Sequence, residues 1–261
     1  MLEMIDHPSD GSIPGGESRI REARLARPPV NALDAELLRA LTAAVDGAAK
    51  ESALIVSGQP GIFSAGLDVR ALLALERDGI AATFIELLRA QRAIARSAIP
   101  VIFAITGHCP AGGCVLAIHG DYRVMALGDF RVGLNEVQVG LVPVPPVILG
   151  AFTRLVGGHA GQLLTRGALV DPATALRVGL VDELCDATQV TSRALAVARE
   201  LCALPREAML KTRSLVRADL HALFGNPGHE LLEERKFGAM AADWFTVPAT
   251  QERLRRQFAK K

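Results

Sequence analysis

The stretch PVIFAITGHCPAGGCVLAIHG, residues Pro100–Gly120, contains a strand, a loop and a helix in direct succession. Pro100–Thr106 is a continuous apolar run rich in β-branched residues, which predicts a buried strand. A glycine-rich loop follows, and the short apolar segment Cys114–Gly120 predicts a helix. Proline and glycine interrupt the apolar residues repeatedly, so the stretch is not expected to span a membrane.

The same order of elements recurs on both sides of this stretch. Ser52–Gly58 predicts a second buried strand, followed by the loop QPGIFSAGLD and a helical segment, Asp68–Arg96, with a break near Asp78-Gly79. Asp121–Leu127 predicts a third strand. Because strand, loop and helix repeat, the economical arrangement is an α/β fold with a largely parallel sheet covered by helices.

The two ends of the chain differ in character. After an irregular start, Arg19–Arg27 predicts a half-exposed strand, and Asp34 is a good N-cap for a helix over the following residues. From Val144 the pattern is mainly helical, with Asp171-Pro172 starting one helix and Gly179–Cys185 forming a last short strand. Four helices are expected beyond that strand, over Ala187–Cys202, Pro205–Arg217, Pro227–Ala242 and Pro248–Ala259.

These patterns divide the chain into an α/β core, residues 1–186, and a helical region, residues 187–261. The helical region is too thin to bury its apolar faces alone. We expect it to pack against a neighbour, either in its own chain or in another subunit.

Composition excludes several classes of protein. The chain has 261 residues, is 50% hydrophobic and 4% aromatic, and carries a formal net charge of +1, which argues against disorder and against a general affinity for nucleic acid or membranes. The N-terminus is acidic and broken by proline and glycine, unlike a signal or transit peptide. The four cysteines lack CxxC spacing, which favours reduced thiols in a cytoplasmic protein and no metal site.

No familiar nucleotide or hydrolase motif is present. The glycine-rich segments have neither the G-x-G-x-x-G of a dinucleotide turn nor the pattern of a P-loop. GIFSAG, around Ser64, lacks the G-x-S-x-G spacing of a nucleophile elbow.

Two loops instead resemble each other in position and composition. Ser64-Ala65-Gly66 and Ala111-Gly112-Gly113 each lie between the end of a strand and the start of a predicted helix. Backbone N–H groups at a helix start have no intrahelical acceptor, and glycine lets a ligand approach them closely. Two such donors facing each other would form an oxyanion hole. The alternative is that both loops are ordinary tight turns.

Glu136 stands alone among Val, Leu and Gly in VGLNEVQVGLVP. Burial there would raise its pKa toward the range useful for proton abstraction; the alternative is a loop or capping glutamate. His108 and His119 flank the second loop, and we expect a structural or solvent role for His108. Asp68 is expected to cap the next helix.

Together these segments carry a resemblance to a known family. FSAGLD (Phe63–Asp68), HCPAGGCVLA (His108–Ala117) and GLNEVQVGL (Gly133–Leu141) resemble, in this order and spacing, the enoyl-CoA hydratase/isomerase family of the crotonase superfamily. PPVNALD near the N-terminus and ALRVGLVDEL (Ala175–Leu184) fit as well. FSAGLD and PAGGC look most like the branch that isomerises 3-enoyl-CoA to 2-enoyl-CoA.

The resemblance implies a crotonase-like spiral of β-β-α units followed by a C-terminal helical trimerisation region, in a homotrimer or a dimer of trimers. It implies no metal or redox cofactor, with CoA as part of the substrate. Its oxyanion donors would be the N–H groups of Leu67 and Gly112, and its catalytic base Glu136. Substrate contacts would fall on Ala65, Gly66, Leu67, Asp68, Val69, Gly112 and Asn135.

The family's two acid/base positions indicate the reaction. Hydratases of the family use two glutamates, whereas here the first position is Val115 and the second is Glu136. A single base favours isomerisation of 3-enoyl-CoA in fatty-acid β-oxidation. The alternatives are a hydratase, another acyl-CoA reaction of the superfamily, or a non-catalytic acyl-CoA-binding module. Arg24 or the terminal RLRRQFAKK could meet the CoA phosphates, and the sequence does not select between them.

Overall fold

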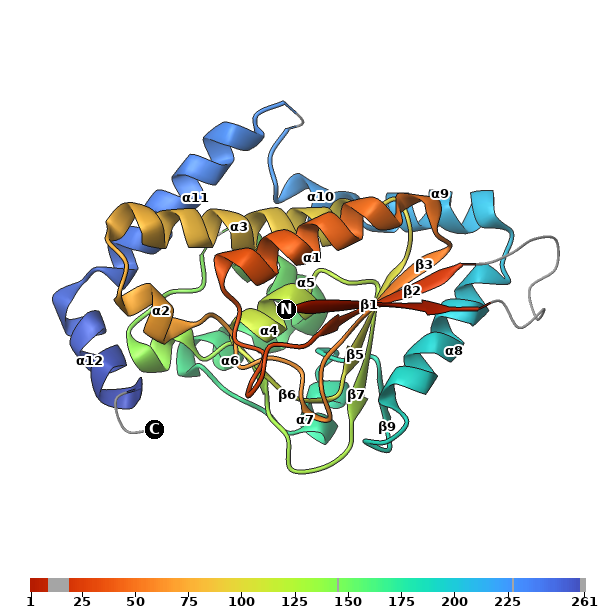
Figure 1. Cartoon of the computed structure of the whole chain (residues 1–261), viewed down its shortest axis with the longest axis horizontal. Coiled ribbons are helices and arrows are strands. Elements are labelled where there is room, and N and C mark those ends of the chain that lie inside the picture. The colour runs from red at the N-terminus through yellow and green to blue at the C-terminus, as the bar shows by residue number, and fades with distance from the viewer. Residues whose placement is uncertain (9–18, 145, 227, 259–261) are drawn as a thin grey trace.

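A computed structural model describes residues 1–8, 19–144, 146–226 and 228–258, and Figure 1 shows a twisted sheet between helices. The main sheet has six strands in the order β1-β2-β3-β5-β7-β9; β1 is antiparallel to β2, and the other neighbours are parallel. The predicted α/β class is therefore confirmed. The strands are β1 (Leu2–His7), β2 (Ile20–Leu25), β3 (Ala53–Ser57), β5 (Val101–Ile105), β7 (Tyr122–Ala126) and β9 (Glu183–Cys185).

The centre of the sheet is buried on both faces, as continuous apolar runs predict for parallel strands. Every residue of β3 and β5 is buried. Side chains alternate between the faces, so Ile55 and Ile102 pack in the cluster under α8 (Val190–Cys202), while Leu54 and Phe103 join the larger cluster on the opposite face.

A second, smaller sheet carries the loops of interest. It contains β4 (Gly61–Ile62), β6 (Gly107–Pro110) and β8 (Val132–Gly133), all parallel, with β6 in the middle. Each short strand follows a long strand of the main sheet and precedes a helical element: α2 (Val69–Leu73), α4 (Gly112–Ala117) or the 3₁₀ helix η2 (Glu136–Val139). This repetition is the β-β-α spiral that the family resemblance implies.

Helix starts follow the predicted caps, but one break is displaced. Asp34 caps α1 (Ala35–Gly47) by accepting the N–H of Leu37 at 2.8 Å. The long predicted helix divides into α2 and α3 (Arg77–Arg96), so the break precedes Asp78. Asp78 instead lies in the first turn of α3, where an acidic residue interacts favourably with the free N–H groups.

The N-terminus is also more regular than expected. Leu2–His7 forms an edge strand that pairs with β2. The pairing supplies its backbone hydrogen bonds, and the local sequence pattern does not predict this. Its last residue, His7, places Nε2 2.9 Å from the buried carboxylate of Glu22. Residues 9–18 lie outside the described part of the chain.

The second half of the chain is helical, as predicted. The predicted helix over Pro205–Arg217 ends at Val216, and a short separate helix follows. Pro227 and Ala259, predicted helix ends, lie outside the described residues. No helix within the described ranges is long and apolar enough to cross a membrane. The remaining helical elements are η1 (Ala48–Lys50), α5 (Val147–Val156), η3 (Gly157–His159), α6 (Ala160–Arg166), α7 (Pro172–Arg177), α9 (Arg206–Val216), α10 (Ala218–Ala222), α11 (Glu230–Phe245) and α12 (Pro248–Phe258).

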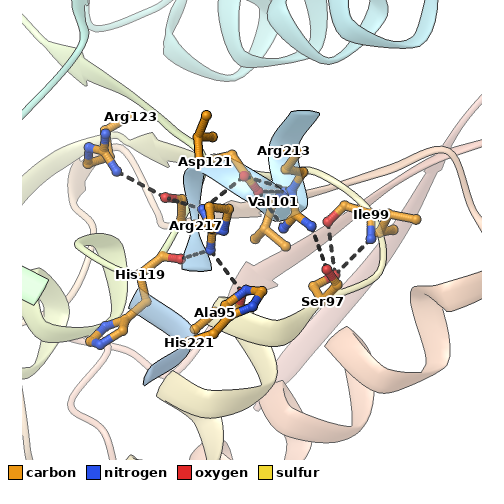
Figure 2. A network of polar contacts seen from close by, with 12 residues as sticks. Ala95, Ser97, Ile99, Val101, His119, Asp121, Arg123, Arg213, Arg217 and His221 are labelled. Atoms are coloured by element: carbon orange, nitrogen blue, oxygen red, sulfur yellow. Dashed lines mark hydrogen bonds and ion pairs between the residues drawn. The ribbon is translucent and has the colours of Figure 1, made fainter. Parts of the chain in front are cut away.

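Buried polar contacts anchor the junction between α9 and α10 to the core (Figure 2). The Arg217 guanidinium donates to the carbonyls of His119 and Ala95 at 2.7 and 3.1 Å. Asp121 accepts from both Arg213 and Arg217, at 2.7 and 2.8 Å. These contacts join the middle of the C-terminal helical region to the end of α3 and to the segment between α4 and β7.

Further along, α11 lies antiparallel to α3 (Figure 1). Arg77 at the start of α3 pairs with Asp243 near the end of α11, at 2.6 Å. Arg92, later in α3, pairs with the earlier Glu234 at 2.5 Å. A Cβ on Gly238 would lie 2.9 Å from the carbonyl oxygen of Ala81, so this helix pair needs glycine at its crossing. The C-terminal helical region therefore packs against the core of its own chain.

Candidate active site

The three loops that follow β4, β6 and β8 meet at one cavity. Because these strands are parallel, their carboxyl ends lie on the same side of the small sheet. The cavity has a volume of about 400 Å³. Its polar end is formed by residues from all three loops, namely Ala65, Leu67, Gly112, Asn135 and Glu136.

In the first loop, one backbone donor is left free. The N–H groups of Ala65, Gly66 and Asp68 donate to acceptors at 2.9, 3.1 and 2.9 Å. The N–H of Leu67, between them, has no acceptor among the described residues, and Leu67 lines the cavity. This pattern distinguishes Leu67 from its neighbours as a donor available to a ligand.

The second donor comes from the start of α4. Gly112 is the first residue of this helix, so its N–H has no intrahelical acceptor. A Cβ added to Gly112 would lie 3.1 Å from both Gly66 Cα and Leu67 N, which shows that the two loops are in contact there. Glycine is required for this approach. The two free N–H groups therefore lie close enough to share one oxygen atom, the arrangement of an oxyanion hole.

Glu136 is the first residue of η2, which follows β8 directly. The residue as a whole is half-buried, but its Oε2 atom is buried and has no hydrogen-bond partner in the described part of the chain. Burial raises the pKa of Glu136 to about 7, because the carboxylate loses hydration, while its own backbone N–H offsets part of this effect. A carboxyl group with this pKa can accept and return a proton near neutrality.

The rest of the cavity is apolar. Val115 of α4 lies beside the polar end, and Leu87 of α3 and Ile148 of α5 form part of the wall. The C-terminal helices complete the enclosure with Trp244, Phe245, Leu254, Gln257 and Phe258. Among the described residues lining the cavity, Glu136 is the one titratable side chain. The cavity thus combines two backbone donors, one carboxyl group and a wall made mostly of aliphatic and aromatic side chains.

The other predicted site residues are placed as follows. Val69 lines the cavity, whereas Gly66 and Asp68 do not. Gly66 faces the turn before α1, and its carbonyl accepts the N–H of Leu33 at 2.8 Å. Asp68 caps α2, as expected, by accepting from Ala71 N at 3.0 Å.

Neither flanking histidine reaches the cavity. His108 is exposed, and its Nδ1 accepts the N–H of Arg131 at 3.2 Å. His119 is fully buried, with Nδ1 2.7 Å from the carbonyl of Val115, and burial lowers its pKa to about 3. His119 is therefore neutral and structural. Arg24, proposed for the CoA phosphates, lies 2.9 Å from Glu22 and does not line the cavity.

Sequence reasoning missed two groups of residues. The apolar pattern of the last helices shows which faces are buried but does not identify the acyl cavity as their partner. Asn31 and Ser64, both fully buried, were not singled out for a role, although a polar residue inside PPVNALD was an available signal. Within the described ranges, no group of three or more His, Cys, Asp or Glu side chains could hold a metal ion.

Comparisons with known proteins agree with this geometry. Residues 15–242 match the family model "Enoyl-CoA hydratase/isomerase". The chain is 30% identical over 210 residues to human mitochondrial enoyl-CoA delta isomerase 1, covering 78% of this chain and 69% of that protein. It is 34% identical over 236 residues to the probable enoyl-CoA hydratase echA17 of Mycolicibacterium paratuberculosis, covering 88% of each. The crystal structure of human mitochondrial delta3-delta2-enoyl-CoA isomerase superposes with a TM-score of 0.85 at 26% identity, covering 98% of this chain and 97% of that one.

Proposed function

The chain belongs to the enoyl-CoA hydratase/isomerase family, and on this premise we propose that it isomerises 3-enoyl-CoA to 2-enoyl-CoA in fatty-acid β-oxidation. The observation that carries the proposal is that Glu136 is the one titratable side chain among the described residues lining the cavity. Moving a double bond by one position needs one proton removed and one proton returned. A single carboxyl group is sufficient for both steps.

The geometry supports the following sequence. The thioester oxygen accepts hydrogen bonds from the N–H groups of Leu67 and Gly112. The Glu136 carboxylate removes a proton from carbon 2, which gives a dienolate whose negative charge is held in the oxyanion hole. The protonated carboxyl group then returns the proton at carbon 4 on the same face. The reaction is redox-neutral and transfers only a proton, so we propose that it uses no metal or redox cofactor.

Val115 supports isomerisation over hydration. Hydration would require a group that holds and activates water beside carbon 3, and the Val115 side chain can do neither. Its isopropyl group instead keeps that part of the cavity apolar. The relatives named as hydratases make hydration the second candidate function, with Glu136 as a lone base.

We also propose that the protein works in the cytoplasm as a homotrimer or a dimer of trimers. An uncovered apolar surface supports assembly. Helix α9 has no buried residue in the described part of the chain, and its Leu215 and Val216 are 63% and 60% exposed. Further copies of the same chain would cover this surface.

The proposed function is tested with Glu136→Gln, which removes the base but keeps the shape of the side chain. We expect isomerisation of 3-enoyl-CoA to fall by at least about a hundredfold, the lower range for losing a general base. Binding of acyl-CoA should remain, and it is measured by fluorescence of Trp244, the one tryptophan of the sequence, which lines the cavity. The control is Glu76→Gln, at an exposed position. Full activity in Glu136→Gln would refute the proposal.

A further inference from the structure

The donor loop Phe63–Asp68 is held by the turn Arg27–Asp34, which lies on the side away from the cavity. Ala65 N donates to the carbonyl of Val30 at 2.9 Å, and Asp68 N donates to the carbonyl of Leu33 at 2.9 Å. These backbone bonds fix the two ends of the loop. A third backbone bond, from Leu33 N to the carbonyl of Gly66 at 2.8 Å, holds the peptide between Gly66 and Leu67, which carries the oxyanion donor. The N–H of the preceding peptide, between Ala65 and Gly66, has no backbone acceptor among the described residues.

Ser64 supplies the acceptor for the Gly66 N–H. Its hydroxyl is fully buried and is used in both directions: it donates to the carbonyl of Asn31 at 2.7 Å and accepts the N–H of Gly66 at 3.1 Å. Without the hydroxyl, Gly66 N–H would be a buried donor lacking a partner. We expect the loop to rotate to satisfy it.

Asn31 holds Ser64 and the loop in register. It is fully buried and has a φ of 49°, in the left-handed region. Its Oδ1 accepts the N–H of Arg27 at 2.9 Å, and its Nδ2 donates to the carbonyl of Phe63 at 3.0 Å. The Asn31 side chain thus joins the turn Arg27–Asp34 to Phe63, the first residue of the donor loop.

The Arg27 side chain contacts Asp68, the residue that follows Leu67. Its guanidinium lies 2.9 Å from the carboxylate of Asp68 and 3.1 Å from that of Asp34. It also donates to the carbonyl of Ala32 at 2.9 Å. The residues on either side of Leu67 are therefore both bonded to the turn Arg27–Asp34, while the N–H of Leu67 has no acceptor among the described residues.

We propose that Ser64 and Asn31 are positioning residues that aim the Leu67 N–H at the thioester oxygen. This inference rests on the proposed function, because it assumes that an acyl-CoA thioester occupies the cavity. Neither side chain lines the cavity, so both act through the loop. Their effect is therefore expected on the strength of the hydrogen bond to the thioester oxygen and on the rate of proton abstraction, with little effect on affinity.

The test combines kinetics with a spectroscopic measurement. Ser64→Ala is expected to lower kcat for 3-enoyl-CoA by about ten- to a hundredfold, less than the hundred- to thousandfold for losing an oxyanion donor outright. KM should change by less than about threefold. Infrared difference spectra of bound octanoyl-CoA labelled with ¹³C at the thioester carbonyl should show a lowered C=O frequency in the wild type, and a smaller lowering in Ser64→Ala.

Asn31→Gly is the second variant, since glycine adopts the left-handed conformation without strain and removes both side-chain hydrogen bonds. We expect it to reduce the carbonyl shift as Ser64→Ala does. Thr42→Ala is the matched control, because it also removes a hydroxyl bonded to a backbone carbonyl, that of Leu38 at 3.0 Å, but lies in α1 outside the cavity. It should leave kcat and the shift unchanged.

The outcomes separate this inference from the proposed function. If folded Ser64→Ala and Asn31→Gly keep the full carbonyl shift and kcat, the positioning role is refuted while the isomerase proposal stands. If the wild type shifts the carbonyl but does not isomerise 3-enoyl-CoA, the proposed function fails, and the comparison of shifts still tests the loop. If the wild type shows no carbonyl shift, the positioning role is refuted as well.

Discussion

At the scale of single residues, the proposed chemistry depends on the lack of polar partners around the Glu136 carboxylate. The sequence shows an isolated carboxyl group in an apolar segment, which predicts a raised pKa, and the structure confirms it at about 7. The cause is burial of Oε2 with no compensating donor. Glu136 is the first residue of η2, and Asn135 occupies its cap position.

The raised pKa has a direct consequence for activity. The base must be ionised to accept the carbon 2 proton, so kcat/KM should be half its maximum near pH 7 and constant well above it. It should fall about tenfold per pH unit below the pKa, as the carboxylate becomes protonated. We expect the inflection near 7 in a pH profile of the free enzyme with 3-enoyl-CoA. An inflection near 4.5, the ordinary value for glutamate, would show that burial does not tune this group.

At the scale of elements, the short strands of the second sheet matter most. β4 and β8 contain two residues each, too few for a periodic signal, so the sequence predicts the loops but not the sheet that brings them together. The same limit affects α4, which begins at Gly112 rather than at the predicted Cys114. That difference is functional, since it makes Gly112 N–H a free donor at the helix start.

Helix α9 allows a prediction about assembly. Leu215 and Val216 are exposed, and Val216 lines a cavity of about 530 Å³ together with Leu204 and Met209. We expect the double substitution Leu215→Glu, Val216→Glu to convert the proposed oligomer to monomers, because charges would be buried without partners in the contact.

Light scattering coupled to size-exclusion chromatography measures the mass directly. Leu176→Glu, in α7, is the control at a leucine that is 42% exposed. An unchanged mass in the double variant would place the subunit contact elsewhere.

At the scale of the whole molecule, the sequence predicted the α/β class, the main parallel strands and the family. It did not predict the place of the C-terminal helices. An amphipathic pattern indicates which face of a helix is buried, but it does not indicate which element covers that face. The contact of α11 with α3 includes ion pairs between residues distant in sequence, such as Arg92 and Glu234. The result is a cavity whose acyl wall comes from the last part of the chain, including Trp244 and Phe258.

The aliphatic composition of the chain is consistent with this architecture. A dienolate is stabilised by fixed N–H donors in surroundings that exclude water, and the wall beyond Glu136 is apolar. Asn31 and Ser64 escape detection from sequence because neither side chain lines the cavity. Only the folded backbone shows that Asn31 reaches the Phe63 carbonyl and that Ser64 reaches the Gly66 N–H.

The most direct test of the central claim compares two reactions of the wild-type protein. The rate of 3-enoyl-CoA isomerisation and the rate of 2-enoyl-CoA hydration are measured with matched chain lengths in one spectrophotometric assay. With Glu136 as the single acid/base group, isomerisation should exceed hydration by at least about a hundredfold, the lower range for the contribution of a missing second group. Hydration as fast as isomerisation, or faster, would contradict the account.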